Sequence, residues 1–179
     1  MKLLLHVCCG PCATYPYKIL KEQGLDVTGF FYNPNIHPYT EYEKRLHGFK
    51  KFSEKVDLPI IIKDSYNLEE FFRNVVFRES ERCRFCYWMR LTEAAGVAKH
   101  GKFNAFTSTL LVSPFQKHQL IREIGEEVGK VYGIDFYYED FRKGFKDGVN
   151  LSKEMGLYRQ QYCGCIYSER DRYIKNVTN

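Results

Sequence analysis

The sequence predicts an α/β fold in which an open, mostly parallel sheet carries helices on both faces. Short apolar runs alternate with longer charged or amphipathic segments, which is typical of parallel strands joined by crossover helices. The run after Lys2, LLLHV, is apolar enough for a strand buried on both faces. The chain has 179 residues, 44% of them hydrophobic and 27% charged, and no repeat or clear linker divides it. We therefore expect a single domain over residues 1–179.

Strand, turn, helix and strand follow one another in the first unit. Residues 2–7 form the first strand, and residues 8–12 form a turn in which Pro11 suits an early helical position. The next helix runs through Ile19 and Leu20 and ends at Gly24, a residue type that commonly caps helix C-termini. Residues 26–32 supply a second strand, which a right-handed crossover should place parallel to the first.

The same pattern repeats more loosely along the rest of the chain. Helices are expected at residues 41–56 and 67–77, after the cysteine turn ERCRFCYWMRL as far as Gly101, and at residues 116–132. Strands are expected at residues 58–63, 102–110 and 135–138. A helical segment at about 141–179 follows, and we expect it to complete the active site. These elements predict a Rossmann-like three-layer sandwich, whose ligands bind beyond the carboxyl ends of the strands.

Charge and composition narrow the partners and the compartment. The net charge of +5 permits an anionic partner such as RNA without requiring one. We recognise no secretory signal and no apolar run long enough to span a membrane, so we expect a cytoplasmic protein without a membrane partner. In that reducing compartment, clustered cysteines serve more often as metal ligands or redox groups than as structural disulfides.

The cysteines are the most informative residues of the chain. The seven fall into three groups: Cys8, Cys9 and Cys12; Cys83 and Cys86; Cys163 and Cys165. A structural zinc ion takes four tetrahedral ligands, which two CxxC turns would supply: Cys9, Cys12, Cys83 and Cys86. An iron–sulfur cube also takes four thiolates, and adjacent cysteines reach two corners of a cube more easily than they surround one ion. The doublet therefore favours a [4Fe-4S] cluster with these ligands: Cys8, Cys9, Cys83 and Cys86.

Three cysteines remain after that assignment. Cys12, Cys163 and Cys165 could hold a second metal ion, or the last two could cycle between a dithiol and a disulfide. Gly164 between the last two gives the backbone freedom to bring both sulfurs to one point.

The other polar residues carry weaker signals. We expect His6 to be a core residue and His37 and His47 to lie on the surface, while His118 could face the site or water. Asp140 follows a strand and could reach the binding edge, although a solvated or capping role is the default for such a carboxylate.

The first strand is not followed by the Gly- and Ser-rich phosphate loop that a nucleotide-dependent enzyme of this fold class would show. The segment CCGPC occupies that position, and no Walker or dinucleotide glycine pattern is found. A tightly held ATP or NAD is therefore not expected.

Several motifs together resemble the QueH-type epoxyqueuosine reductases. They are HVCCGPC, RCRFCYWMRL, FTSTLLVSPFQ, FYYEDFRKGF and LYRQQYCGCIYS, in this order and over nearly the whole chain. The resemblance implies a sheet similar to nucleotide alpha-hydrolase-like folds without the ATP loop. It also implies a cobalamin-independent oxidoreductase that removes the epoxide oxygen of epoxyqueuosine at the wobble position of a tRNA anticodon, leaving queuosine. Its expected centre is an iron–sulfur cluster beside a redox-active cysteine pair or a second metal.

Residue by residue, the resemblance agrees with the spacing argument. It implies cluster ligation by Cys8, Cys9, Cys83 and Cys86, and it makes Cys163 and Cys165 the second redox element. Epoxide deoxygenation consumes two electrons, and a single cube ordinarily passes one electron at a time. A mononuclear iron on Cys163, Cys165 and Cys12, acting as a Lewis acid, would solve this problem, and a dithiol would be the rival solution.

The remaining expectations concern the substrate. Arg82, Arg142 and Arg159, with Tyr162 and nearby aromatic residues, should hold the anticodon loop, because cations neutralise phosphates and rings stack on unpaired bases. Asp140 or Tyr162 is the expected proton donor to the leaving oxygen. The electron donor is unidentified. A non-catalytic zinc-stabilised RNA-binding module and a tRNA-thiolating enzyme are the alternatives.

Overall fold

The computed structural model describes residues 1–174, in which five parallel strands form a sheet of order β3-β2-β1-β4-β5. The strands are β1 (Lys2–His6), β2 (Asp26–Phe31), β3 (Ile60–Ile62), β4 (Ala105–Ser108) and β5 (Asp135–Phe136). The chain adds β2 and β3 on one side of β1, then crosses back and adds β4 and β5 on the other. The loops that follow β1 and β4 therefore diverge, and the carboxyl ends of these two strands form the usual ligand-binding point.

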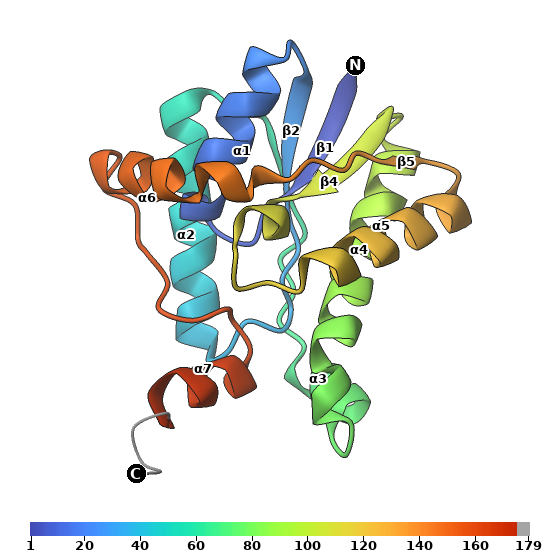
Figure 1. Cartoon of the computed structure of the whole chain (residues 1–179), viewed down its shortest axis with the longest axis vertical. Coiled ribbons are helices and arrows are strands. Elements are labelled where there is room, and N and C mark those ends of the chain that lie inside the picture. The colour runs from blue at the N-terminus through green and yellow to red at the C-terminus, as the bar shows by residue number, and fades with distance from the viewer. Residues whose placement is uncertain (175–179) are drawn as a thin grey trace.

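Helices cover both faces of the sheet, as predicted. They are α1 (Gly10–Glu22), α2 (Tyr39–Val56), α3 (Leu68–Val75), α4 (Arg82–His100), α5 (His118–Tyr132), α6 (Phe145–Glu154) and α7 (Ile166–Tyr173). Figure 1 shows α1, α2 and α6 on one side of the strands and α4 and α5 on the other, with α3 and α7 beyond the carboxyl edge. Short 3-10 turns are η1 (Glu79–Glu81), η2 (Thr109–Val112) and η3 (Phe141–Gly144). The three-layer α/β fold is thus confirmed.

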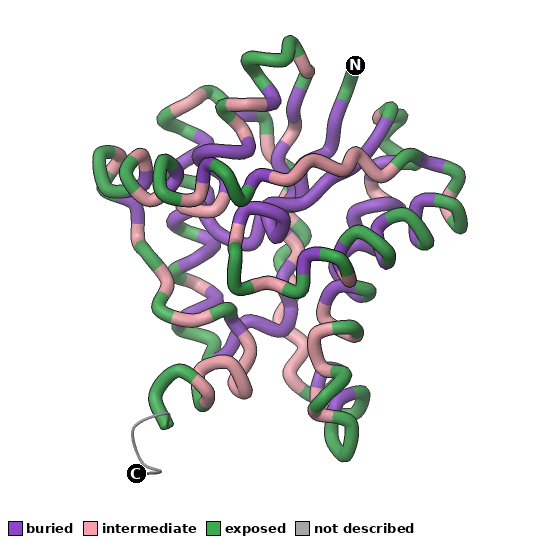
Figure 2. Tube along the Cα trace, viewed as in Figure 1, coloured by how far each residue is buried: buried purple, intermediate pink, exposed green. Residues whose placement is uncertain are grey.

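The central strand explains why the first apolar run is continuous. Leu3, Leu4 and Leu5 have 0% exposure, although successive side chains of a strand point to opposite faces. Both faces are covered by helices, so most of the strand is apolar. Burial along the inner strands is visible in Figure 2, where the exposed residues gather on the outer helices and loops.

A glycine contact sets the start of α1. A Cβ atom on Gly10 would collide with the backbone carbonyl oxygen of Gly48 in α2. Only glycine allows α1 to approach α2 this closely, which explains the glycine within CCGPC. The same contact fixes where the cysteines on either side of Gly10 can lie.

Some element boundaries differ from the predicted ones. The strand expected at residues 102–110 is confined to Ala105–Ser108, because Lys102 adopts a left-handed φ of 55° in a turn and Thr109 begins η2. The cysteines expected in turns partly belong to helices: Cys12 lies in α1, and Cys83 and Cys86 lie in the first two turns of α4.

The C-terminal segment and the length of the helices bear on two further predictions. Of the segment expected at 141–179, residues 175–179 lie outside the described part of the chain. Among the helices of residues 1–174, none has the length and apolar character needed to cross a membrane.

Candidate metal centre

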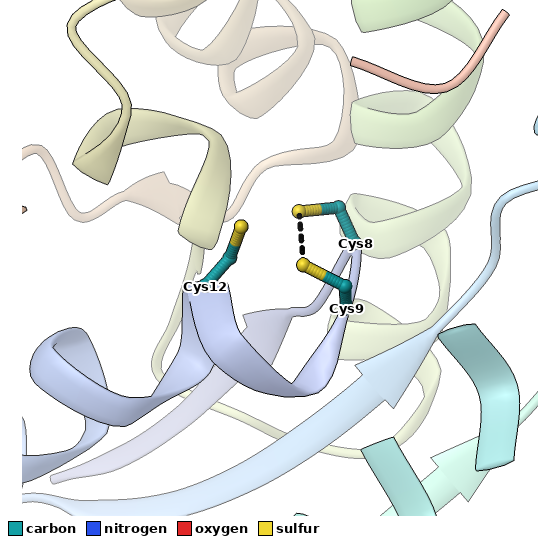
Figure 3. A group of neighbouring side chains, drawn as sticks. All are labelled: Cys8, Cys9 and Cys12. Atoms are coloured by element: carbon teal, nitrogen blue, oxygen red, sulfur yellow. Dashed lines mark hydrogen bonds between the residues drawn. The ribbon is translucent and has the colours of Figure 1, made fainter. Parts of the chain in front are cut away.

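Three cysteine sulfurs meet where β1 ends and α1 begins. The Sγ atoms of Cys8, Cys9 and Cys12 all lie within 4.8 Å of one another, with 3.8 Å between the first two (Figure 3). Cys9 is the extended residue immediately before α1, and Cys12 follows three positions later, so both sulfurs point to one side of the helix start. Thiolates bound to one zinc ion at about 2.3 Å would lie roughly 3.8 Å apart, so this group is close to the geometry of a soft metal site.

Neighbouring polar groups support this three-sulfur group. The backbone N–H of Cys8 donates to the Thr109 hydroxyl oxygen at 3.1 Å. The same hydroxyl donates its proton to the Cys8 sulfur at 3.4 Å. Thr109 begins η2 directly after β4, so both strands at the centre of the sheet contribute. Gln160, from the segment before α7, donates its amide N–H to the Cys12 sulfur at 3.1 Å.

The pKa values of the three thiols are shifted in different directions. Hydrogen bonds from Cys12 and then from Cys9 hold the pKa of Cys8 well below its usual value. Burial raises the pKa of Cys9, and the hydrogen bond to Cys8 raises that of Cys12. These shifts favour the thiolate form at Cys8 over those at Cys9 and Cys12, and a metal ion bound by the three sulfurs would displace their protons.

The other two cysteine groups lie close to each other. Cys83 and Cys86 are half-buried in the first two turns of α4, where their spacing of three places them on one face. Burial raises the pKa of Cys83 and raises that of Cys86 to about 12. The charges of Cys163 and Cys165 add to this effect on Cys86, so the CGC segment lies near the start of α4.

The structure groups the cysteines differently from the ligand set expected from the sequence. Within residues 1–174, the group of candidate ligands that meet within 4.8 Å consists of Cys8, Cys9 and Cys12. Cys12, which was left over from the expected cluster ligands, is therefore beside the doublet. Cys83 and Cys86 are not part of this tight group, and their place in a wider cluster remains a prediction.

Arg45 of α2 anchors the CGC segment and was missed by the sequence analysis. It is 1% exposed and forms an ion pair with Glu41, one helical turn earlier, at 2.7 Å. Its other nitrogens donate to the carbonyl oxygens of Cys163 at 2.6 Å and Tyr162 at 2.9 Å. Its charge also favours the thiolate forms of Cys8 and Cys163. A charged residue in a helix is normally solvated, so the sequence offered no signal for this role.

Arg90 of α4 is a second buried cation, with a different environment. It is 2% exposed, and two of its nitrogens donate to the Oδ1 atom of Asn35 at 3.0 and 2.6 Å. No ion pair of the described residues includes it. Its charge favours the thiolates of Cys86 and Cys163. A buried guanidinium without a carboxylate is costly, and an anionic centre beside it would remove that cost.

The donor set and the buried charges fit a thiolate-bound metal centre. The sulfurs are soft ligands, and the two buried arginines are placed to offset the negative charge of several thiolates. Buried polar atoms without a partner lie on the same β2–α2 loop, among them Nδ2 of Asn35 and Nε2 of His37. The residues present are therefore able to bind a metal.

The predicted proton donors differ in their protonation. Asp140 caps η3 and forms an ion pair with Arg142, whose hydrogen bonds lower the pKa of Asp140 to about 2. Burial raises the pKa of Tyr162 to about 12, and its hydroxyl donates to the carbonyl oxygen of His37. Near neutral pH, Asp140 is thus ionised, whereas Tyr162 retains its proton.

The predicted RNA-binding arginines have separate surroundings. Arg82 forms an ion pair with Asp171 of α7 at 2.7 Å, and its guanidinium lies over the Tyr167 ring. Arg142 is bound to Asp140, and Arg159 is exposed. No hydrogen bond or ion pair within residues 1–174 joins these arginines to a cysteine side chain. Their role in binding RNA remains a prediction.

The predictions for His6 and His47 are confirmed, whereas His37 and His118 lie elsewhere than expected. His6 is a core residue that contacts Ser108 through Nδ1, and His47 is exposed. His37, expected on the surface, is 2% exposed, because the rings of Phe71 and Phe72 cover it. His118 is buried and faces the Leu111 carbonyl oxygen.

Known proteins resemble this chain over nearly its whole length. The family model for epoxyqueuosine reductase QueH matches residues 3–171. A curated epoxyqueuosine reductase QueH of Dehalococcoides mccartyi is 43% identical over 97% of this chain and 96% of its own length. One of Thermotoga maritima is 35% identical over 98% of this chain and 94% of its own length.

A solved structure, titled a predicted subunit of tRNA methyltransferase from Methanocaldococcus jannaschii, has a similar fold. Its TM-score is 0.59 at 10% sequence identity, over 86% of this chain and 75% of that one. At this identity the likeness concerns the fold alone.

Proposed function

This chain belongs to the QueH family of epoxyqueuosine reductases, and from this premise we propose that it converts epoxyqueuosine to queuosine in the anticodon of tRNA. It is an oxidoreductase, and the reading as a non-catalytic zinc module is not favoured. The observation that carries the proposal is the convergence of Cys8, Cys9 and Cys12 at the central strand ends, where this fold binds ligands. The proposed place of action is the cytoplasm.

The reaction removes one oxygen atom and needs two electrons. Both C–O bonds of the epoxide break, a C=C bond forms, and the oxygen leaves as water after taking up two protons. The electrons come from an external donor. A site for this reaction must therefore bind a redox group, hold the substrate next to it and supply protons.

We assign the redox group to the cysteines. The proposed cluster is [4Fe-4S], with Cys8, Cys9, Cys83 and Cys86 as its ligands. When bound, it would supply electrons one at a time. What supports a thiolate-bound centre is the grouping of the first three sulfurs and the burial of two arginines beside the cysteines.

The second redox element is proposed at Cys163 and Cys165, with Cys12 as the third ligand if the element is a mononuclear iron. The dithiol form of the same pair is the competing proposal. Arg45 supports either version, because it holds the CGC backbone against α2 through two carbonyl oxygens. The C-terminal segment thereby completes the site, as we propose for residues 141–174.

Between the two proposed proton donors, Tyr162 is better supported. The Tyr162 hydroxyl is protonated at neutral pH, whereas Asp140 is ionised. Tyr162 also directly precedes Cys163 in the sequence. A phenol can hydrogen-bond to the oxygen as negative charge develops on it. The remaining residues of the proposal, Arg82, Arg142 and Arg159, would bind phosphates of the anticodon loop.

An anaerobic turnover assay tests the proposed function. The protein is purified without oxygen, reduced with dithionite and mixed with tRNA that carries epoxyqueuosine, and queuosine is measured by mass spectrometry of digested RNA. We expect conversion without cobalamin, an affinity for tRNA that falls steeply with salt, and brown protein that contains iron and sulfide. A colourless zinc protein without conversion would support the zinc module instead. ATP-dependent incorporation of sulfur into tRNA would support the thiolating enzyme.

A further inference from the structure

The side chain of Gln116 links the second and third cysteine groups. Gln116, in the loop between η2 and α5, donates an amide N–H from Nε2 to the Cys163 sulfur at 3.0 Å. Its Oε1 atom accepts the hydroxyl proton of Tyr87 at 2.7 Å. Tyr87 lies on α4 immediately after Cys86. The chain from Tyr87 through Gln116 to Cys163 therefore connects the start of α4 with the CGC segment.

The orientation of the Gln116 amide is determined by these contacts. Tyr87 is 2% exposed, and its hydroxyl donates to Oε1 of Gln116 in this buried position. The hydroxyl accepts the backbone N–H of Lys117 at 3.2 Å and is free to donate its own proton to Gln116. Oε1 of Gln116 must therefore face the tyrosine, and the NH2 group must face the sulfur.

Gln160 shows what this anchoring adds. Its amide also donates to a cysteine sulfur, that of Cys12, at 3.1 Å. Its Oε1 atom, however, is buried without a hydrogen-bond partner in the described part of the chain. In Gln160 only the amide nitrogen has a hydrogen-bond partner, whereas in Gln116 both the nitrogen and the oxygen have one. Gln116 is therefore the more strongly oriented donor.

The two cysteines of the CGC segment are not equivalent. Cys163 is exposed and receives the Gln116 amide, whereas Cys165 is half-buried and precedes α7 as its N-cap. No side-chain hydrogen bond of the described residues reaches the Cys165 sulfur. The asymmetry indicates that Cys163 is the sulfur whose charge the protein controls.

We propose that Gln116, oriented by Tyr87, is a positioning residue that holds the Cys163 sulfur and raises the reduction potential of the redox element to which it belongs. An N–H donor stabilises the state with more negative charge on sulfur, which is the reduced state of an iron–thiolate centre and the thiolate state of a dithiol. The direction of the effect is therefore the same for both versions of the second redox element. The inference rests on the proposed function, because it takes Cys163 to be redox-active.

The magnitude follows from the strength of the contact. A hydrogen bond to a charged group contributes about 1.5–3 kcal/mol, which is at least about tenfold in an equilibrium constant. A tenfold change corresponds to about 59 mV for a one-electron couple and about 30 mV for a two-electron couple. Since the amide also contacts the oxidised sulfur, only part of this strength distinguishes the two states, and we expect Gln116→Leu to lower the midpoint potential by this amount or less.

The experiment is an anaerobic redox titration of the loaded protein with four variants. Gln116→Leu removes the donor, and Tyr87→Phe removes only the hydroxyl that orients it. Gln161→Leu is the matched control, because this exposed amide bonds to the carbonyl oxygen of Arg159 and not to a sulfur. Tyr17→Phe controls for Tyr87→Phe, since the Tyr17 hydroxyl donates to the carbonyl oxygen of Val56 and not to Gln116. Iron content and circular dichroism are measured for each protein.

The expected result is a lower potential for Gln116→Leu, a smaller decrease for Tyr87→Phe, and no change for either control, with iron content preserved. Equal potentials for Gln116→Leu, Tyr87→Phe and the wild type would overturn the inference, as would an equal decrease in the controls. The proposed function is judged separately by the wild type alone. If the wild type fails to form queuosine, that function is wrong, whatever the potentials of the variants.

Discussion

Replacement of Arg45 by methionine tests how the CGC segment is held. Arg45→Met keeps an unbranched side chain of similar length but removes the charge and every donor. It leaves the buried carboxylate of Glu41 in α2 with the Tyr158 hydroxyl as its remaining partner, and it frees the carbonyl oxygens of Tyr162 and Cys163. Because the side chains of the ion pair are only 1% and 7% exposed, solvent does little to compensate the loss.

The expected cost follows from these contacts. Breaking a buried ion pair by removing one partner typically costs about 3–5 kcal/mol, most of it from the charge that remains. We expect Arg45→Met to lower the free energy of unfolding by about this amount. The double variant Glu41→Gln with Arg45→Met should recover part of the stability, since no orphan charge is left, but it should not recover turnover, since the CGC backbone is still unanchored.

Urea unfolding of the metal-free, reduced protein measures the stability, and the anaerobic conversion assay measures turnover. Metal-free protein is used so that lost metal affinity does not enter the free energy. A loss below about 1 kcal/mol for Arg45→Met would refute the reasoning, because that is the range of an exposed pair. Full recovery of turnover in the double variant would also refute the anchoring role.

Three other predictions concern the fold and its charges. Gly10→Ala should destabilise the protein by about 1–3 kcal/mol in thermal melts, because its Cβ would meet the Gly48 carbonyl; unchanged stability would contradict the close helix contact. Burial and then the Arg90 charge lower the pKa of His37 to about 4, so the unfolded chain binds a proton first and stability should fall as the pH drops from about 6.5 to about 4. His37→Asn should remove up to about 3 kcal/mol of that decrease in urea unfolding at pH 7 and pH 4, and identical pH profiles would argue against a neutral buried ring. Arg90→Met should leave metal-free protein as stable or more so but reduce the iron retained after gel filtration, and undiminished iron would show that Arg90 does not offset an anionic centre.

The sequence was informative about the sheet because each strand is short and apolar between turn residues. The continuous run of Leu3, Leu4 and Leu5 predicted a central strand, and the structure has it between β2 and β4. Strand ends were less predictable. Thr109 has strand propensity, yet it turns into η2, where its hydroxyl binds Cys8, a contact between residues 101 positions apart.

The cysteine groups could be recognised from the sequence, but their spatial partners could not. The spacing of three between Cys9 and Cys12 already places both sulfurs on one helix face, whereas the neighbours of Cys163 come from other elements. Arg45 and Gln116 act through contacts with residues far away in the chain, and each belongs to a residue type that is usually solvated. His37 was misplaced for the same reason, since aromatic rings from α3 cover it.

The central claim is that iron held by the cysteines of this chain carries out the reduction. The most direct measurement is the queuosine formed per chain in a single anaerobic turnover, for samples of the protein that contain graded amounts of iron. We predict that product rises in proportion to bound iron and is absent from iron-free protein. Equal product from iron-free and iron-replete samples would contradict the account.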